Sequence, residues 1–136
     1  MGRILALDYG RKRTGIAVTD ELQLIASGLT TVLTKELLTF IVSYIKNEKV
    51  DKIVIGEPKQ MNNEPSESEK DITAFINKLV DKLPETPIER QDERFTSKMA
   101  MSSMIVGGMG KKKRQNKALV DEISATLILQ AYLNRK

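Results

Sequence analysis

The spacing of the apolar residues changes at about residue 35, and this change limits the possible folds more than any other feature of the sequence. Before residue 35, β-like apolar runs are separated by short turns, and they span Ile4–Asp8, Thr14–Thr19 and Leu24–Thr34. After residue 35, helical spacing alternates with short apolar runs. We therefore predict three antiparallel strands first, followed by helices that alternate with parallel strands.

In the second part of the chain, the sequence predicts helices that alternate with strands. One helix is expected at 35–48 with Thr34 as its N-cap, and another opens at Ser66, where Glu69 completes a capping box. The apolar stripe of this second helix has helical spacing and comprises Ile72, Phe75, Ile76, Leu79, Val80 and Leu83. The remaining elements are strands at Lys52–Gly56 and Ile88–Asp92 and helices at Phe95–Val106 and Leu119–Leu133. Together they predict a three-layer α/β fold, with a mixed five-stranded sheet, in one domain over residues 1–136.

Turn signals separate the first three strands. Gly10 is expected to supply a positive φ in the first turn, Asp20-Glu21 form the second, and Ser27-Gly28 interrupt the third strand. No stretch approaches the roughly 18 apolar residues of a membrane span, and the apolar run at the start is too short for a signal peptide. We therefore expect a cytoplasmic protein with no membrane partner.

The absence of histidine and cysteine limits the chemistry open to the chain. It excludes thiolate and imidazole metal sites, a cysteine nucleophile, and every catalytic triad that needs an imidazole. Any hydrolysis must therefore use carboxylates, a hard cation bound through oxygen, or lysine and tyrosine.

The net charge of +4 comes from two short basic patches on an otherwise acidic chain. Focal charge of this kind predicts contact with a polyanion at defined points, whereas the alternative is that basic loops only aid solubility. The residues expected to contact phosphates are Arg11, Lys12, Arg13, Lys111, Lys112, Lys113, Arg114 and Lys117.

Three acidic residues lie at positions that suggest chemistry. Asp8 ends an apolar strand, Glu93 follows the last predicted strand, and Asp121 lies in the first turns of the last helix. Each also has a structural explanation: a turn before a glycine, an acidic turn before a helix, and a favourable charge near a helix N-terminus. Ser124 and Ala125 lie three and four residues after Asp121, so this side of the helix is small enough to approach a sheet closely. The spacing alone leaves open whether the three acids converge.

If they converge, a bound cation is needed, because three crowded carboxylates raise one another's pKa. Mg²⁺ or Mn²⁺ would relieve the repulsion through oxygen ligands. Two such ions can hold the attacking water and the leaving oxygen of a phosphodiester.

Four segments resemble, in order, the motifs of the YqgF-type family, whose members are described as Holliday junction resolvases and pre-16S rRNA nucleases. They are residues 5–18, 53–61, 92–97 and 117–129. The resemblance implies an RNase H-like fold and a metal-binding triad of Asp8, Glu93 and Asp121. The first segment also resembles the phosphate-binding hairpin of the actin and sugar-kinase superfamily, but 136 residues cannot hold the two lobes that those enzymes need.

Three further residues are accessory candidates. Glu57 stands where we expect an apolar residue in much of the family, and we interpret it as a surface residue rather than a fourth metal ligand. Arg94 would brace Glu93 by a salt bridge or touch the scissile phosphate, and we favour bracing. Tyr9 is placed to stack on one base.

The sequence hypothesis is a metal-dependent endonuclease for structured nucleic acid, acting on the 5′ end of pre-16S rRNA. Trimming an RNA precursor needs one site, with the ribosomal particle as a further partner. The alternatives are a Holliday junction resolvase, which needs two coordinated cuts in branched DNA and hence usually a dimer, and a non-catalytic protein that binds nucleic acid or a transcription complex. Monomer and homodimer both remain open.

Overall fold

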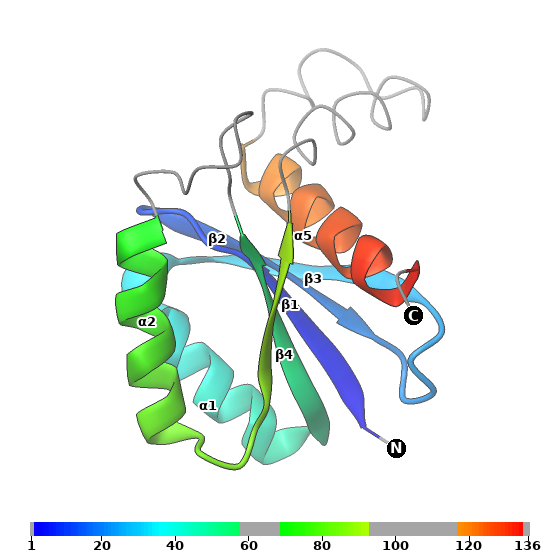
Figure 1. Cartoon of the computed structure of the whole chain (residues 1–136). Helices are drawn as coiled ribbons and strands as arrows, with labels where there is room; N and C mark the ends of the chain where they lie inside the picture. The colour runs from blue at the N-terminus through cyan, green and yellow to red at the C-terminus, as the bar shows by residue number, and fades with distance from the viewer. Residues whose placement is uncertain (1, 58–68, 93–116, 135–136) are drawn as a thin grey trace.

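A mixed sheet of five strands forms the centre of the protein (Figure 1). The structure is a computed structural model that describes residues 2–57, 69–92 and 117–134. The strand order is β3-β2-β1-β4-β5; β1 is antiparallel to β2 and parallel to β4, β2 is antiparallel to β3, and β4 is parallel to β5. The strands are β1 (Arg3–Asp8), β2 (Arg13–Thr19), β3 (Ala26–Leu33), β4 (Val50–Glu57) and β5 (Ile88–Asp92). The mixed sheet with three antiparallel strands at the start is therefore confirmed.

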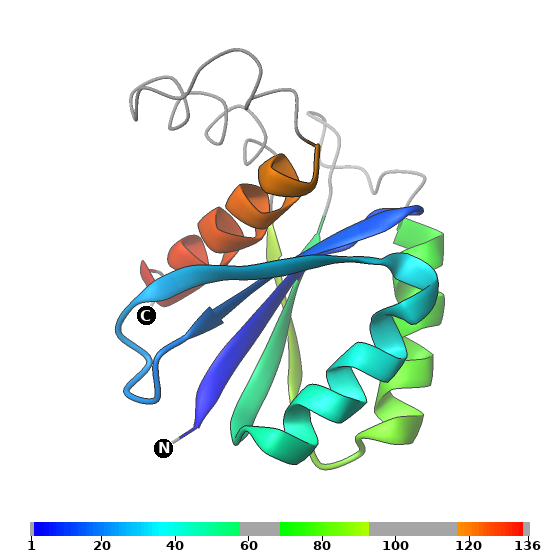
Figure 2. The same ribbon diagram turned by 180° about the vertical axis from the view of Figure 1, so that it is seen from behind.

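Helices cover both faces of this sheet, as the two opposite views show (Figures 1 and 2). One face carries α1 (Leu37–Asn47), which follows a short 3₁₀ turn η1 (Thr34–Glu36), and α2 (Glu69–Lys82). The other face carries α5 (Lys117–Asn134). The predicted three-layer architecture is confirmed. The second predicted long helix is α2, whose predicted start at Ser66 lies outside the described ranges, as does the helix predicted at 95–106. No helix within those ranges is long and apolar enough to cross a membrane.

The core consists of two clusters, one on each face of the sheet. Alternate residues of a strand point to opposite faces, so Leu5 and Leu7 of β1 pack toward α1 and α2, whereas Ile4 and Ala6 pack toward α5. All four are fully buried, because β1 is a central strand covered on both sides.

Hydrogen bonds of the Tyr132 side chain hold α5 against the sheet near the C-terminal end of the helix. The Tyr132 hydroxyl is buried and donates to Glu89 of β5, and Lys52 of β4 donates to the same hydroxyl at 3.0 Å. Lys52 Nζ also lies 3.0 Å from Glu89 Oε2. The hydrogen bonds to Tyr132 and Glu89 raise the pKa of Lys52, so this group keeps its charge as it ties α5 to two strands.

The prediction that Thr34 caps the first long helix is wrong. The Thr34 hydroxyl donates to the Gly10 carbonyl at 2.5 Å, and its backbone N–H donates to the Lys12 carbonyl at 2.8 Å. The N-cap of α1 is Glu36, which makes no side-chain cap hydrogen bond. Thr34 instead ties the end of β3 to the turn between β1 and β2.

Val80 was predicted in the buried stripe of α2, and this prediction is also wrong. Its side chain is 46% exposed, whereas Ile72, Phe75 and Leu79 are buried. At 100° per residue Val80 lies at the edge of the stripe, turned away from the direction that these three side chains share.

Gly10 is required in its turn for a reason other than positive φ. Its φ lies outside the left-handed region, but a Cβ at this position would lie 2.5 Å from the Arg13 carbonyl oxygen. The interruption predicted at Ser27-Gly28 is a register shift in a continuous strand, because Ile16 pairs with Thr30 and the next residue pairs with Gly28.

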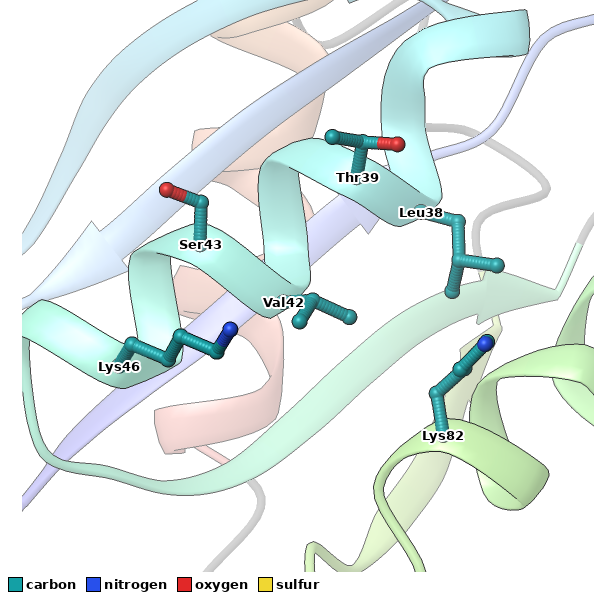
Figure 3. Close-up of a pocket in the computed structure, with 6 residues that line it drawn as sticks. All are labelled: Leu38, Thr39, Val42, Ser43, Lys46 and Lys82. Carbon is teal, nitrogen blue, oxygen red and sulfur yellow. The ribbon is translucent and has the colours of Figure 1, made fainter.

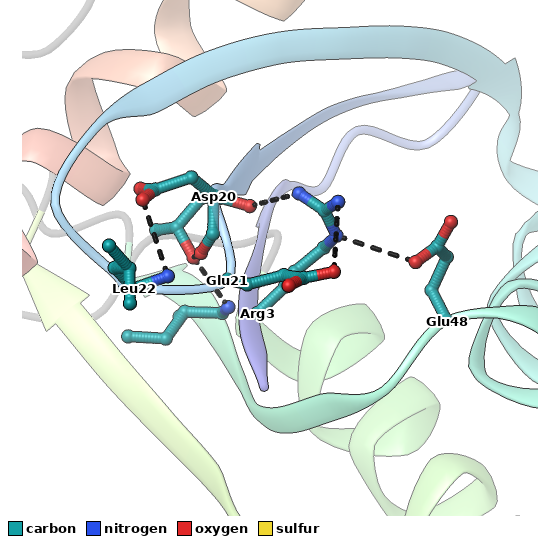
Figure 4. Close-up of polar contacts among 7 residues, drawn as sticks. Arg3, Asp20, Glu21, Leu22 and Glu48 are labelled. Carbon is teal, nitrogen blue, oxygen red and sulfur yellow. Dashed lines mark hydrogen bonds and ion pairs between the residues drawn. The ribbon is translucent and has the colours of Figure 1, made fainter. Parts of the chain in front are cut away.

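β3 begins two residues later than predicted because Asp20 organises the turn before it (Figure 4). The Asp20 carboxylate accepts backbone N–H bonds from Leu22, Leu24 and Ile25 at 3.2, 2.8 and 2.8 Å. These bonds, with that from Ile25 the largest, lower the pKa of Asp20.

We expect Asp20→Ala to lower the melting temperature at pH 7 by more than it does at acidic pH. A carboxyl whose pKa falls on folding stabilises the native state above its ordinary pKa of about 3.9. That contribution is lost as the pH falls through the lower folded value, so the wild type and variant should converge there. Thermal unfolding at both pH values measures the difference, and a gap that is independent of pH would contradict this role of Asp20.

Candidate active site

Three acidic residues end three neighbouring strands at one edge of the sheet. Since β1, β4 and β5 are parallel, their carboxyl ends meet at that edge. Leu7 pairs with Ile55, so Asp8 ends β1 beside the end of β4, and Glu57 pairs with Asp92 at the ends of β4 and β5. Sites of open α/β sheets gather at this edge.

Helix α5 brings Asp121 to the same region by resting directly on the backbone of β2. Gly15 pairs with Asp8 across the β1–β2 ladder, and a Cβ at Gly15 would lie 2.0 Å from the Asp121 carbonyl oxygen. Ser124 and Ala125 are buried at this contact side, as their small size led us to expect. Asp8 thus lies beside Gly15 in the sheet, and the backbone of Asp121, distant in sequence, lies over the same glycine.

Asp121 is paired with an arginine that we expected to contact phosphate. Arg13 Nε donates to Asp121 Oδ2 at 3.1 Å, and the two side chains are 35% and 24% exposed. This half-buried pair reduces the repulsion between Asp121 and the acids at the edge of the sheet. The two residues are separated by 108 positions, so sequence spacing held no signal for the contact.

The turn between β1 and β2 is joined to α2. Arg11 Nε lies 2.9 Å from Asp71 Oδ2 in an exposed ion pair, and the Tyr9 ring packs against Phe75 at 5.4 Å between centroids. Burial first, and then the negative charge of Asp71, raises the pKa of Tyr9. Tyr9 is therefore partly engaged in the packing of α2, which limits its expected role in base stacking. Lys12, at the tip of the turn, is exposed.

Arg90 fixes the end of β4, and sequence reasoning missed it. Its guanidinium binds both carboxylate oxygens of Glu69, at 2.6 and 3.0 Å, at the start of α2. It also donates to the carbonyl oxygens of Ile55 at 3.2 Å and Gly56 at 3.0 Å. Arg90 thereby holds the backbone immediately before Glu57, and the five donors of arginine suit this role.

We expect Arg90→Ala to destabilise the fold by about 2–3 kcal/mol, because Glu69 and two strand carbonyls lose their partner in a largely buried place. Arg11→Ala is the matched control, since it removes another ion pair to α2. Its pair with Asp71 is exposed, so its removal should cost less than about 1 kcal/mol. Chemical denaturation measures both values, and equal values would contradict the role assigned to Arg90.

The remaining predicted site residues cannot be placed. Glu93, Arg94 and residues 111–114 lie outside the described ranges, and Lys117 begins α5 with a side chain that is not described. Among the residues that are described, no group of three or more acidic side chains forms a metal site. Of the predicted triad, Asp8 and the backbone of Asp121 both lie next to Gly15.

Comparison with known proteins decides the family. The family model for RuvX, described as Holliday junction resolvase, matches residues 2–135. The chain belongs to the RuvX family. RuvX is the YqgF-type family of the sequence analysis, so the predicted family and enzyme class, a nuclease, are confirmed.

Two relatives match this chain over nearly its full length and nearly their own. A protein of Christiangramia forsetii is 65% identical over 98% of both chains. A protein of Phocaeicola vulgatus is 60% identical over 100% of this chain and 98% of its own. Both carry the name "Putative pre-16S rRNA nuclease".

Solved structures of RuvC share the fold. Thermus thermophilus RuvC matches with a TM-score of 0.60 and 14% identity, over 98% of this chain and 96% of its own. T. thermophilus RuvC in complex with a Holliday junction substrate matches with a TM-score of 0.59, also at 14% identity, over 99% and 96%. At this identity the likeness shows the fold alone, which is the predicted RNase H-like fold.

Proposed function

We propose that this RuvX protein is a metal-dependent endonuclease that processes the 5′ end of pre-16S rRNA, acting as a single cytoplasmic domain. The observation that carries the proposal is the approach of Asp8 and Asp121 across Gly15, at the edge where the parallel strands end. The names of relatives at 60–65% identity support pre-16S rRNA as the substrate.

The donor set at this edge fits a hard divalent cation. A chain without histidine or cysteine offers only oxygen ligands here, and Mg²⁺ and Mn²⁺ prefer carboxylate and water oxygens. Asp8, Asp121 and Glu93 would hold the cation. A cation bound there would polarise a phosphate oxygen and lower the pKa of a bound water.

The other residues of the site orient and bind. Arg13 holds Asp121 through Oδ2, and Oδ1 would be the oxygen that binds a ligand. Arg11 and Lys12 follow Asp8 in the turn and would contact phosphates beside the cut, together with the basic residues 111–117. Contacts to the phosphate backbone position the substrate without reading its sequence.

A Holliday junction resolvase is the second candidate, and the description of the RuvX family favours it. Symmetric cutting of a four-way junction needs two active sites related by two-fold symmetry, hence a dimer. Cutting one end of an RNA precursor needs a single site.

A nuclease assay with Mg²⁺, Mn²⁺ or EDTA tests the proposal. One labelled substrate is an RNA that spans the precursor 5′ end of 16S rRNA, and the other is a four-way DNA junction. We expect cleavage of the RNA alone, abolished by EDTA. Paired symmetric cuts in the junction would establish a resolvase instead, and metal-independent binding of either substrate without cleavage would establish a binding protein.

A further inference from the structure

A groove runs between α1 and α2, on the face of the sheet opposite α5. It consists of two hollows of about 320 and 450 Å³ that share Leu38. Figure 3 shows the first hollow, where Lys46 of α1 and Lys82 of α2 lie on opposite sides of Val42 and Leu38. The second hollow reaches the turn that follows Asp8 and includes Lys35 and Lys78. We call both hollows together the α1–α2 groove.

The charge of the α1–α2 groove is strongly one-sided. Lys35, Lys46, Lys78 and Lys82 are all exposed, and within the described ranges none of them forms an ion pair. Asp71 is the one acid among the described lining residues, and Arg11 neutralises it at 2.9 Å. Outside its basic patches the chain is net acidic, so four lysines without a matching acid form a distinct positive surface.

The spacing of these lysines suits a polymer of phosphates. Eleven positions separate Lys35 from Lys46, which corresponds to about 16 Å at 1.5 Å per helical residue. A nucleic acid strand carries one phosphate per nucleotide, so a row of this length can meet more than one phosphate of the same strand. Lys78 and Lys82 line the opposite wall, four residues apart on α2.

The α1–α2 groove reaches the turn that follows Asp8. Tyr9 and Arg11 line its near end, and they stand one and three residues after Asp8 in the chain. Leu38, Val42 and Phe75 supply apolar surface between the lysines, so the charged groups that the groove offers to phosphates are mainly positive.

We propose that the α1–α2 groove binds the sugar–phosphate backbone of the RNA strand that leads to the carboxylate edge. This inference rests on the proposed function and extends its substrate contacts to a second face of the molecule. Because the turn after Asp8 lines the near end of the groove, a nucleic acid strand is favoured over an acidic protein: one polymer could contact both the groove and the carboxylate edge. The lysines act as positioning residues, since they contact the substrate away from the scissile bond.

Binding of a fluorescein-labelled pre-16S RNA fragment, measured by anisotropy in EDTA at several KCl concentrations, tests the groove without any cleavage step. The test variant is Lys46→Gln/Lys82→Gln. The control, Lys49→Gln/Lys70→Gln, removes the same charge from exposed lysines outside the groove lining. For two lost contacts to single-stranded RNA we expect the salt slope to fall by about 1.4 and the affinity at 0.1 M salt to fall roughly 20-fold. The control should bind as the wild type does.

Cleavage by the wild-type protein, measured in parallel, separates the two proposals. Normal cleavage with equal RNA binding by both double variants would overturn the groove and leave the nuclease intact. Weaker binding by the groove variant alone, with no cleavage by the wild type under any metal, would overturn the nuclease and support the groove. Binding of labelled polyglutamate is measured in the same way. If Lys46→Gln/Lys82→Gln loses polyglutamate binding but binds RNA as the wild type does, the groove proposal is overturned in favour of an acidic protein partner.

Discussion

Asp8→Asn is expected to reduce RNA cleavage by a factor on the order of 10³, because the site loses an anionic oxygen ligand at the end of β1. Binding of uncleaved RNA should stay equal or become tighter, since a negative charge near the phosphates is removed. Initial cleavage rates in Mg²⁺ and Mn²⁺ measure the first effect. Metal binding is measured separately, as the increase in melting temperature on adding metal. This increase should disappear in the variant.

Asp81→Asn is the matched control for this prediction. Asp81 is exposed near the end of α2, so the same change of charge there should leave the cleavage rate and the response to metal unchanged. Wild-type cleavage by Asp8→Asn together with tighter RNA binding would show that Asp8 only repels nucleic acid. That result would remove the catalytic assignment of the carboxylates.

Glu57→Gln tests whether the acid at the end of β4 belongs to the site. We interpret Glu57 as a surface residue, and metal-induced stabilisation should then be the same in the variant and the wild type. A weaker response to metal would make Glu57 a fourth ligand, at the edge that it shares with Asp8.

Gly15→Ala is expected to disturb stability and activity together. The added methyl group would lie 2.0 Å from the Asp121 carbonyl oxygen and 2.3 Å from its carbon, and a backbone clash is not relieved by a change of rotamer. Either α5 moves away from β2 or the fold is strained, at about 3 kcal/mol. A shift of α5 carries Asp121 away from Asp8, so cleavage should fall more than the loss of folded protein explains.

Gly28→Ala provides the control, because Gly28 also faces α5 from the sheet. A methyl group there would lie 3.4 Å from Thr126 Oγ1, which is close to ordinary contact. Its free energy of unfolding should stay within about 0.5 kcal/mol of the wild type. Chemical denaturation and cleavage rates measure both variants. If Gly15→Ala behaved like Gly28→Ala, the close approach of α5 to β2 would be wrong.

The elements of this fold could be predicted where one local pattern decides them. Apolar runs such as Ile4–Leu7 define central strands, and the stripe around Ile72 and Leu79 defines a helix, because burial on a face imposes a period on the sequence. Val80 shows where such a pattern stops being informative, since a residue at the edge of a stripe is buried or exposed according to the neighbouring helix.

The candidate site could be predicted only in part, because its geometry depends on contacts between distant segments. The motif resemblance identified Asp8 and Asp121, and the small residues after Asp121 predicted a close approach to the sheet. The pair of Arg13 with Asp121 and the hydrogen bonds of Arg90 join residues with no regular spacing. Thr34 was mistaken for a cap because a threonine before a helix has a local use, whereas the carbonyl that its hydroxyl binds, that of Gly10, lies 24 residues earlier in the chain.

The position of α5 also constrains the order in which the protein can fold during its synthesis. Its face of the core contains Ile4, Ala6 and Ala17 from the first two strands, which leave the ribosome long before α5 is made. Until then these side chains have no helix to cover them, although α1 and α2 can already pack on the other face. The same helix carries Asp121, so Asp121 is not beside Gly15 and β1 until α5 has been made and has packed on the sheet. Under the proposed function, a nascent chain that lacks α5 would therefore be unable to cut RNA.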